Sequence, residues 1–521
     1  MLKVKIYDTT LRDGAQSEGI SYSVTDKIRV TQELDKLGIQ YIEGGWPGSN
    51  PKDMEFFRKA AKLRLRNSVL AAFSMTRRSG ISAAEDSNIK ALVKSGAKII
   101  TIVGKTWGLH IEDVLKISLD ENLKMIKDTI QYLKSKGIIV FYDAEHFFDA
   151  YKADKEYSLK CLLTAEEAGA EAICLCDTNG GTLTSEITKI ITAIKPKIKV
   201  CLGIHCHNDC GLAIANSIAA VEAGCTMVQG TINGYGERCG NADLIPIIAN
   251  LQLKLNINCI RDENLKELAH VSHFISEISN LRVKNDQPFI GDSAFAHKGG
   301  MHINAVMKNP ATYEHIEPDL VGNRRRILVS ELGGKTGIML RAKAMDLDLS
   351  KEDPKTKKIL KLLQDLEHSG YHFEAAEASF ELLVKKALKK YGKFFELESF
   401  RVVVEKQSNK KITSEAIMKV RVKGVREHTA AEGDGPVNAL DNALRKALKD
   451  FYPMLSKMRL SDFKVRVLDE KAGTAAKVRV LIQSQDEIDT WNTIGVSENI
   501  IEASWQALVD SVEYKLLKDK A

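Results

Sequence analysis

Short apolar runs alternate with amphipathic stretches through the first half of the chain. Each run has the length of a buried strand, and the stretches between them repeat their apolar positions every three or four residues, as helices do. The eight runs span Val4–Asp8, Ile39–Gly44, Val69–Ser74, Lys98–Val103, Ile138–Asp143, Ala172–Cys176, Val200–Ile204 and Met227–Ile232. Strand–helix units in this number predict an α/β fold, a parallel sheet closed into a TIM (β/α)8 barrel over residues 1–284.

A glycine precedes most of the apolar runs. These glycines are Gly38, Gly96, Gly137, Gly169 and Gly224. Glycine is favoured directly after a helix because it adopts the left-handed backbone conformation without steric cost. Their positions therefore predict that a helix ends just before each of these strands begins.

Polar residues gather where the predicted strands end. On a barrel of this kind the carboxyl ends of the strands form one rim, and that rim carries the active site. The residues at the predicted rim are Arg12, Asp13, Glu43, Glu145, His146, Asp177, Thr178, Asn179, His205, His207, Asn233, Glu237, Arg238 and Asn241. Because they follow several different strands, we expect one shared site.

Two of the rim histidines are spaced for metal binding. His205 and His207 lie two positions apart at the seventh strand, so both side chains point to the same side. Together with Asp13, which follows the first strand, they form a set of two histidines and one carboxylate. Such a set leaves positions open for substrate and is typical of a catalytic rather than a structural metal site.

The strand–helix alternation stops after residue 284. Residues 285–390 are predicted to form small helical linker subdomains, including a broken helical stretch from Pro354 to Lys390. The arginines at 324–326 are interpreted as a solvated turn rather than as a phosphate site. Arg77 and Arg78, after the third strand, are interpreted either as partners of a phosphate group or as solvated loop residues.

The last part of the chain, residues 391–521, is predicted to be an α+β domain. Strands precede a helix from Val437 to Phe451, and further strands precede a helix from Asn499 to Leu516. Aligning Asn438 with Asn499 gives a weak internal pseudo-repeat at an offset of 61 residues. Glycine-rich turns are predicted at residues 432–435 and 493–495. The domain is interpreted as a regulatory or dimerisation module.

Composition narrows the class of protein. A chain of 521 residues suggests two or three domains, and 44% hydrophobic and 28% charged residues are ordinary for a globular protein. The net charge of +6 is spread along the chain without a basic tail, so nucleic acid is not an expected partner. We expect no signal peptide and no membrane span. The nine cysteines are interpreted as buried or half-buried free thiols of a cytoplasmic protein.

Three motifs at the rim resemble those of one enzyme family. They are Asp8–Gln16 (DTTLRDGAQ), Gly203–Gly211 (GIHCHNDCG) and Gly234–Ala242 (GYGERCGNA). In combination they resemble the 2-isopropylmalate, homocitrate and citramalate synthases, acyltransferases that condense an acyl-CoA with a 2-oxoacid on a metal-bearing TIM barrel. The stretch Glu43–Pro51 is most similar to the citramalate branch, whose substrates are pyruvate and acetyl-CoA.

The resemblance implies roles for rim residues. It implies that Asn241 is a further metal ligand and that the ion is zinc, manganese or magnesium. It also implies that Arg12 binds the substrate and stabilises the charge that develops on the keto oxygen. Thr178 is implied to bind the carboxylate of the 2-oxoacid.

The resemblance also implies a base and a quaternary structure. The base that removes a methyl proton from acetyl-CoA is implied to be His302, with Glu145 as its orienting partner and Tyr313 nearby. His302 is implied to act in the active site of the neighbouring subunit of a homodimer. The C-terminal domain is implied to bind an amino-acid effector, isoleucine for an enzyme that feeds isoleucine biosynthesis.

Three alternatives stay open. A larger 2-oxoacid would make the chain a 2-isopropylmalate or homocitrate synthase, and the pocket lining around Ala72, Phe73, Ile102 and Asp143 decides this. A metal-dependent acyl-CoA lyase would run the reverse carbon–carbon cleavage, but the long C-terminal domain argues against it. A catalytically silent amino-acid sensor is disfavoured because Arg12 and the metal ligands are intact.

Overall fold

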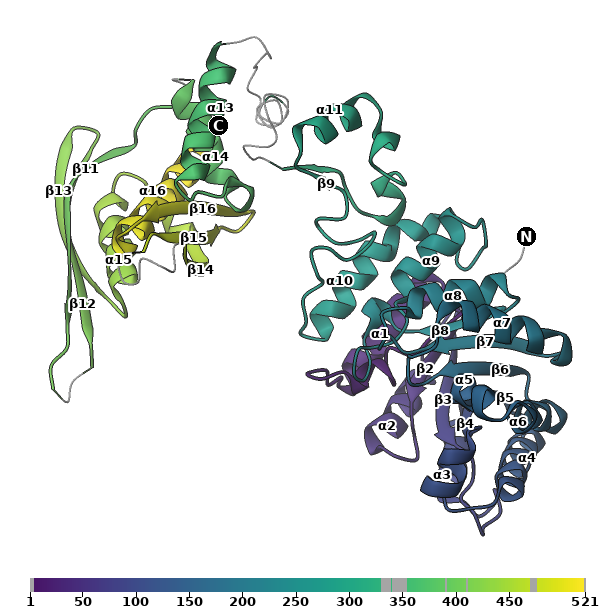
Figure 1. The fold of residues 1–521 in the computed structure, drawn as a ribbon. Coiled ribbons are helices and arrows are strands. Elements are labelled where there is room, and N and C mark those ends of the chain that lie inside the picture. The colour runs from purple at the N-terminus through teal and green to yellow at the C-terminus, as the bar shows by residue number, and fades with distance from the viewer. Residues whose placement is uncertain are drawn as a thin grey trace. The chain divides into compact units, whose positions relative to one another are not determined.

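The computed structural model describes residues 4–328, 339, 354–388, 391–408, 411–468 and 476–519. They form two compact units (Figure 1). The first unit comprises Met1–Phe295 and Ile316–Arg324, and the second comprises Ala296–His315 and Arg325–Ala521.

A closed barrel of eight parallel strands fills the first unit, which confirms the predicted TIM barrel. Its strands are β1 (Lys5–Asp8), β2 (Tyr41–Gly45), β3 (Val69–Met75), β4 (Ile99–Lys105), β5 (Ile139–Glu145), β6 (Ala172–Asp177), β7 (Cys201–Cys206) and β8 (Met227–Gly230). Neighbours pair in chain order, and β1 closes the barrel on β8 with Tyr7 opposite Gln229.

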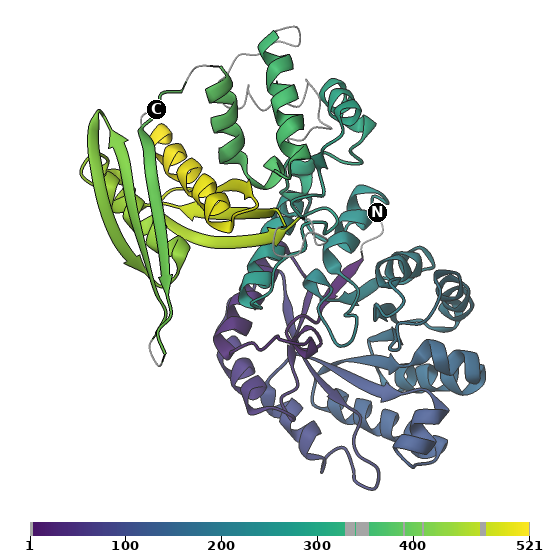
Figure 2. The ribbon, with the colours of Figure 1, turned by 60° about the vertical axis from the view of Figure 1, so that its left-hand side comes forward.

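Helices surround the barrel strands (Figure 2). They are α1 (Val24–Leu37), α2 (Pro51–Ala60), α3 (Ser87–Ser95), α4 (Leu119–Ser135), α5 (Phe147–Ala153), α6 (Lys155–Ala168), α7 (Thr184–Ile194), α8 (Ala213–Glu222), α9 (Leu244–Leu253) and α10 (Leu268–Ile278). The five glycines predicted to follow helices all have positive φ, from 73° at Gly96 to 112° at Gly224. Among the described residues, no helix combines the length and apolarity that crossing a bilayer requires.

Alternation along each barrel strand divides the core into two layers. One face, with residues such as Ile6 and Ile204, packs in the large apolar cluster that includes the helices. The other face fills the barrel interior. Its buried members are Tyr7, Ala71, Ile99, Phe141, Ala172, Cys174, Cys176 and Met227. All nine cysteines are free thiols, as expected, but the expected burial is wrong for Cys210 and Cys239, which are exposed.

The second unit begins with a two-stranded sheet and short helices. β9 (Ala296–His297) pairs in parallel with β10 (Arg326–Ile327), and α11 (Gly300–Lys308) follows β9. Further along the chain lie α13 (Pro354–His368) and α14 (Glu377–Ala387). These two helices match the predicted broken helical stretch, whose last residues, 389 and 390, lie outside the described residues.

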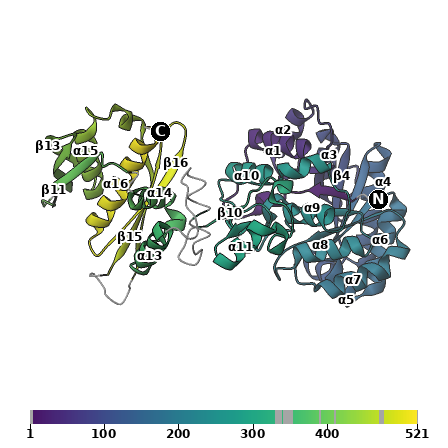
Figure 3. The ribbon, with the colours of Figure 1, turned by 90° about the horizontal axis from the view of Figure 1, so that it is seen from above.

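Two sheet-and-helix layers complete the second unit. The first consists of β11 (Phe395–Glu405), β12 (Thr413–Val422), β13 (Val425–Gly433) and α15 (Pro436–Leu448). The other consists of β14 (Arg459–Val467), β15 (Val478–Gln485), β16 (Thr490–Ser497) and α16 (Ile500–Lys518). Each sheet is antiparallel, and α16 packs against β15 and β16 as α15 packs against β12 and β13 (Figure 3).

The pseudo-repeat is real, but its predicted offset of 61 residues is wrong. β11 begins at residue 395 and β14 at residue 459, and α15 begins at 436 and α16 at 500, so both pairs are 64 residues apart. The error comes from pairing two asparagines with different roles. Asn499 is the N-cap of α16 and accepts from the backbone N–H groups of Ile501 and Glu502, whereas Asn438 lies inside α15.

The predicted turn at residues 493–495 is also wrong, because these residues lie within β16. A Cβ atom on Gly495 would lie 2.0 Å from the carbonyl oxygen of Ala503 in α16. Glycine is therefore required at 495 by the close approach of the helix, not by a turn. At residues 432–435, Gly433 still belongs to β13, and only residues 434 and 435 form a bend.

This packing predicts that Gly495→Ala destabilises the protein. Overpacking of this kind typically lowers the free energy of unfolding by about 1–3 kcal/mol. Gly435→Ala is the matched control, because a Cβ there meets no heavy atom within 4 Å and its φ is −157°. Urea denaturation followed by circular dichroism measures both. Equal stability of the two variants would contradict the packing argument.

Candidate active site

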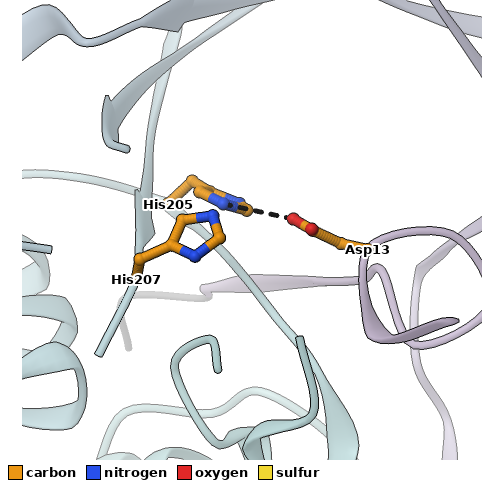
Figure 4. A group of neighbouring side chains, drawn as sticks. All are labelled: Asp13, His205 and His207. Carbon is orange, nitrogen blue, oxygen red and sulfur yellow. Dashed lines mark ion pairs between the residues drawn. The ribbon is translucent and has the colours of Figure 1, made fainter. Parts of the chain in front are cut away.

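Asp13, His205 and His207 meet at the carboxyl end of the barrel (Figure 4). His205 lies on β7, His207 follows that strand and pairs through its backbone with Asn241, and Asp13 follows β1. One ligand atom of each of the three lies within 4.8 Å of the other two. Nε2 of His205 is 3.4 Å from Oδ2 of Asp13. All three side chains are more than nine-tenths buried.

The protonation states of these groups suit a cation. Burial lowers the pKa of His205 to about 4 and also lowers the pKa of His207. Burial alone would raise the pKa of Asp13, but the Arg12 guanidinium and the two histidines outweigh it, so the net shift is downward. At neutral pH the site therefore offers an ionised carboxylate and two neutral imidazoles, the forms that bind metals.

Two buried polar atoms beside this cluster support metal binding. Nδ1 of His207 and Oδ1 of Asn241 have no hydrogen-bond partner among the described residues. Buried polar atoms are normally satisfied, so such atoms call for an explanation. The set of carboxylate oxygen, amide oxygen and two imidazole nitrogens fits a divalent cation. The choice between zinc, manganese and magnesium stays a prediction.

Gln229, on β8, was missed by sequence reasoning. It is fully buried, and its Oε1 lies 3.1 Å from Nδ1 of His205. Its Nε2 donates to Oδ1 of Asp143 at 2.9 Å. A signal for it exists once a barrel is predicted, because Gln229 lies two positions after Met227, which fills the barrel interior, and pairs with His205 across the strands.

Arg12 is fixed by a carboxylate and an aromatic ring. Its Nε donates to Oε2 of Glu43 at 2.5 Å, and its guanidinium lies 3.9 Å from the ring centroid of Phe73. Glu43 in turn accepts from the hydroxyl of Tyr7. Burial alone would lower the pKa of Arg12, but the carboxylates of Glu43 and Asp13 raise this pKa by more than burial lowers it. The pKa therefore lies above its usual value, and the guanidinium stays charged. The sequence placed Glu43 at the rim but did not identify this pairing.

A cavity of about 500 Å³ opens beside these groups. The predicted rim residues that line it are Arg12, Asp13, Glu145, Thr178, His205, His207, Glu237 and Arg238. Its walls also include Trp46 and Phe73, whose rings meet edge to face at 5.7 Å. Of the other residues predicted to line the pocket, Asp143 does so, but the prediction is wrong for Ala72 and Ile102, which pack in the apolar cluster that includes the helices. Asn233, also predicted to lie at the rim, does not line the cavity. Its side-chain amide donates to the backbone carbonyl of Ser272 in α10. The volume is suited to a small ligand.

Glu145 and Thr178 lie in the cavity with partners of their own. Glu145 forms an ion pair with Lys105 at the end of β4, a residue that the sequence did not single out. The hydroxyl of Thr178 accepts from the backbone N–H of His146 at 2.9 Å. Because this hydroxyl accepts there, its own hydrogen is free to point to a ligand.

His302 and Tyr313 belong to the second compact unit. Their rings stack with centroids 4.1 Å apart and an angle of 29° between planes. His302 lies in α11, and Tyr313 is about half exposed. The structure thus brings these two predicted residues together, and their roles stay predictions.

The structure shows the partners of the two groups of arginines that the sequence singled out. Arg77 and Arg78 line the cavity, but each already pairs with a carboxylate: Arg77 with Asp128 at 2.6 Å and Arg78 with Asp86 at 3.2 Å. The interpretation of 324–326 as a solvated turn is wrong for Arg325. Its guanidinium makes two bonds to the buried Glu314, which also pairs with His297.

Three family models match the chain. An HMGL-like model matches residues 3–275, and a homocitrate synthase post-HMGL domain-like model matches residues 289–370. A LeuA allosteric (dimerisation) domain model matches residues 374–516. Together they span both compact units.

Full-length relatives carry related names. A protein of Geobacter sulfurreducens named (R)-citramalate synthase is 53% identical over 100% of this chain and 99% of its own length. One of Aquifex aeolicus with the same name is 52% identical, over 99% of this chain and 98% of its own. A 2-isopropylmalate synthase of Methanocaldococcus jannaschii is 32% identical, over 99% of this chain and 95% of its own.

The site geometry predicts that His205→Asn abolishes tight binding of a divalent metal. Loss of an outer partner of a metal ligand costs about 10–100-fold in affinity, so loss of a ligand costs more than about 100-fold. Calorimetric titration of metal-stripped protein with Mn²⁺ measures this. His273→Asn, at an exposed position of α10, is the control and keeps the wild-type Kd. Equal Kd values for both variants would refute the site.

Proposed function

We propose that this chain, which belongs to the HMGL-like family and within it to the (R)-citramalate synthases, condenses acetyl-CoA with pyruvate. Water completes the reaction, and the products are citramalate and CoA. The observation that carries the proposal is the likeness, over the full length, to two proteins of that name. The enzyme is an acyltransferase in which the acyl group becomes an alkyl group on transfer.

The 2-oxoacid binds in the cavity at the barrel mouth. A divalent ion held by Asp13, His205, His207 and Asn241 would polarise the keto and carboxylate oxygens. Arg12 stabilises the negative charge that develops on the former keto oxygen, since Glu43 and Phe73 hold its guanidinium in place beforehand. The free hydroxyl hydrogen of Thr178 is available for the substrate carboxylate.

A base is needed to make the nucleophile. We assign this step to His302, whose imidazole removes a proton from the methyl group of acetyl-CoA. The resulting enolate carbon bonds to the keto carbon of pyruvate, and the keto oxygen takes up a proton. Water then cleaves the thioester and releases CoA. Tyr313 holds the imidazole of His302 by stacking, and Glu145 is assigned to orient it.

The proposal includes a homodimer in which His302 of each chain completes the active site of the other. The match to a LeuA allosteric (dimerisation) domain supports the dimer. The three matched segments also support a division into a catalytic domain (1–284), linker subdomains (285–390) and a regulatory domain (391–521). Isoleucine is the proposed effector of the regulatory domain. The nine free thiols support a cytoplasmic location.

A second candidate function is 2-isopropylmalate synthase activity. It is favoured by the full-length relative of that name in Methanocaldococcus jannaschii. The two activities differ by a small apolar extension of the 2-oxoacid, and one methylene in such a pocket is worth about 1–3 kcal/mol. We therefore expect pyruvate to be preferred and 2-oxobutanoate to be a slower substrate.

Release of CoA tests the proposal directly. Purified protein, acetyl-CoA and a divalent metal are combined with pyruvate, 2-oxoisovalerate or 2-oxoglutarate, and a thiol reagent reports free CoA. The expected result is a strong preference for pyruvate. Preference for 2-oxoisovalerate would favour the second candidate, and no release with any acid would refute both.

The role of Arg12 predicts a loss of turnover in Arg12→Lys. Lysine keeps the charge but not the planar contacts to Glu43 and Phe73, so kcat falls by about 100–1,000-fold, the cost typical of a lost oxyanion donor. Arg29→Lys is the matched control, because Arg29 also lies over a phenylalanine ring, that of Phe274 at 5.3 Å. Steady-state kinetics with pyruvate distinguish them. Similar kcat values would exclude the proposed role.

A further inference from the structure

Gln229 links a metal-binding histidine to a carboxyl group inside the barrel. It lies on β8, between His205 on β7 and Asp143 on β5. Its side chain is fully buried, His205 is 6% exposed and Asp143 is 4% exposed. These three side chains form one continuous line of hydrogen bonds, at 3.1 Å and 2.9 Å.

The direction of these bonds determines which nitrogen of His205 is protonated. The Gln229 amide oxygen faces Nδ1 and can only accept, so Nδ1 carries the hydrogen. Nε2 then keeps its lone pair, and Nε2 is the atom that faces Asp13 at 3.4 Å. The amide nitrogen donates to Asp143. An oxygen of Asp143 accepts this bond whether the carboxyl group is ionised or protonated.

We propose that Gln229 is a positioning residue for the metal site: it holds His205 as the Nδ1–H tautomer, with Nε2 aimed at the ion. This inference rests on the proposed metal site and extends it to a residue outside the ligand set. Metal-ligating histidines generally donate their second N–H to an oxygen, which fixes the ring and raises the basicity of the ligand. In this site the accepting oxygen belongs to the side-chain amide of Gln229, whose nitrogen donates a hydrogen bond to Asp143.

The two ligand histidines differ in this respect. Nδ1 of His207 has no hydrogen-bond partner among the described residues, whereas Nδ1 of His205 has Gln229. Only His205 therefore has its tautomer fixed by a described side chain before any ion binds. Gln229 therefore preorganises the His205 side of the proposed metal site.

The test is Mn²⁺ affinity, measured by calorimetry on metal-stripped full-length protein without substrates. Gln229→Met keeps the volume but removes both hydrogen bonds, and we expect the Kd to rise by about 10–100-fold. Gln229→Glu keeps an acceptor for Nδ1–H, and we expect its Kd to change by less than about tenfold. The absorption spectrum of bound Co²⁺ provides a second readout of ligand geometry, and it changes in Gln229→Met.

Gln252→Met is the matched control. Gln252 is also buried, and it likewise accepts with Oε1, from Ile260, and donates with Nε2, to Asp262, but away from the metal site. We expect it to keep the wild-type Kd. An unchanged Kd in Gln229→Met, or an equal loss in both methionine variants, would overturn the proposal.

Gln229→Glu decides the matter if Gln229→Met does not fold. Retained affinity in this variant supports the proposal, and a loss of tenfold or more overturns it. Absence of Mn²⁺ binding by the wild type would overturn the metal site and this inference together. The CoA-release assay tests the condensation independently, so a failure of this inference is distinguishable from a failure of the proposed function.

Discussion

The pairing of the first barrel strand with the last is the contact on which the site depends. Hydrogen bonds along Lys5–Asp8 and Met227–Gly230 join β1 to β8 and so close the sheet. In an open sheet of the same strand order, β1 and β7 would lie near opposite edges. Closure instead places Asp13, which follows β1, beside His205 on β7. The candidate metal ligands therefore come together only when the chain has folded through to its eighth strand.

Buried charge is the second constraint at the barrel mouth. Burial raises the pKa of Asp143 to about 8 and also raises that of Glu43, despite the ion pair with Arg12, while the pKa of Asp13 is lowered. One guanidinium cannot neutralise three desolvated carboxylates, so part of the negative charge is removed by protonation. A divalent cation between Asp13 and the histidines would add positive charge where it is lacking. The pKa shifts of the carboxyl groups and the unsatisfied buried polar atoms thus both favour a cation at this site.

Patterns local in sequence made much of this predictable. Strand and helix periodicity predicted the barrel, and the spacing of His205 and His207 predicted that both face one point. Gln229 belongs to no motif, because its importance depends on the register of β8 against β7 and on the position of Asp143 on β5 in the closed barrel. The missed offset of the pseudo-repeat has a similar cause: Asn499 caps a helix and Asn438 does not, which only backbone geometry distinguishes. Gly495 resembled a turn residue because sequence does not show how closely α16 approaches.

The division of the chain into two units has a consequence for control. His302 belongs to the same compact unit as the segment that matches an allosteric domain, and Lys298, four residues before His302 in the sequence, pairs with Glu374 at the start of that segment. The ligand cluster belongs to the other unit. Under the role proposed for His302, an effector bound to that segment would act on the unit that carries the base and not on the unit that carries the ligand cluster. Control of this kind would lower the maximal rate and leave the affinity for the 2-oxoacid unchanged.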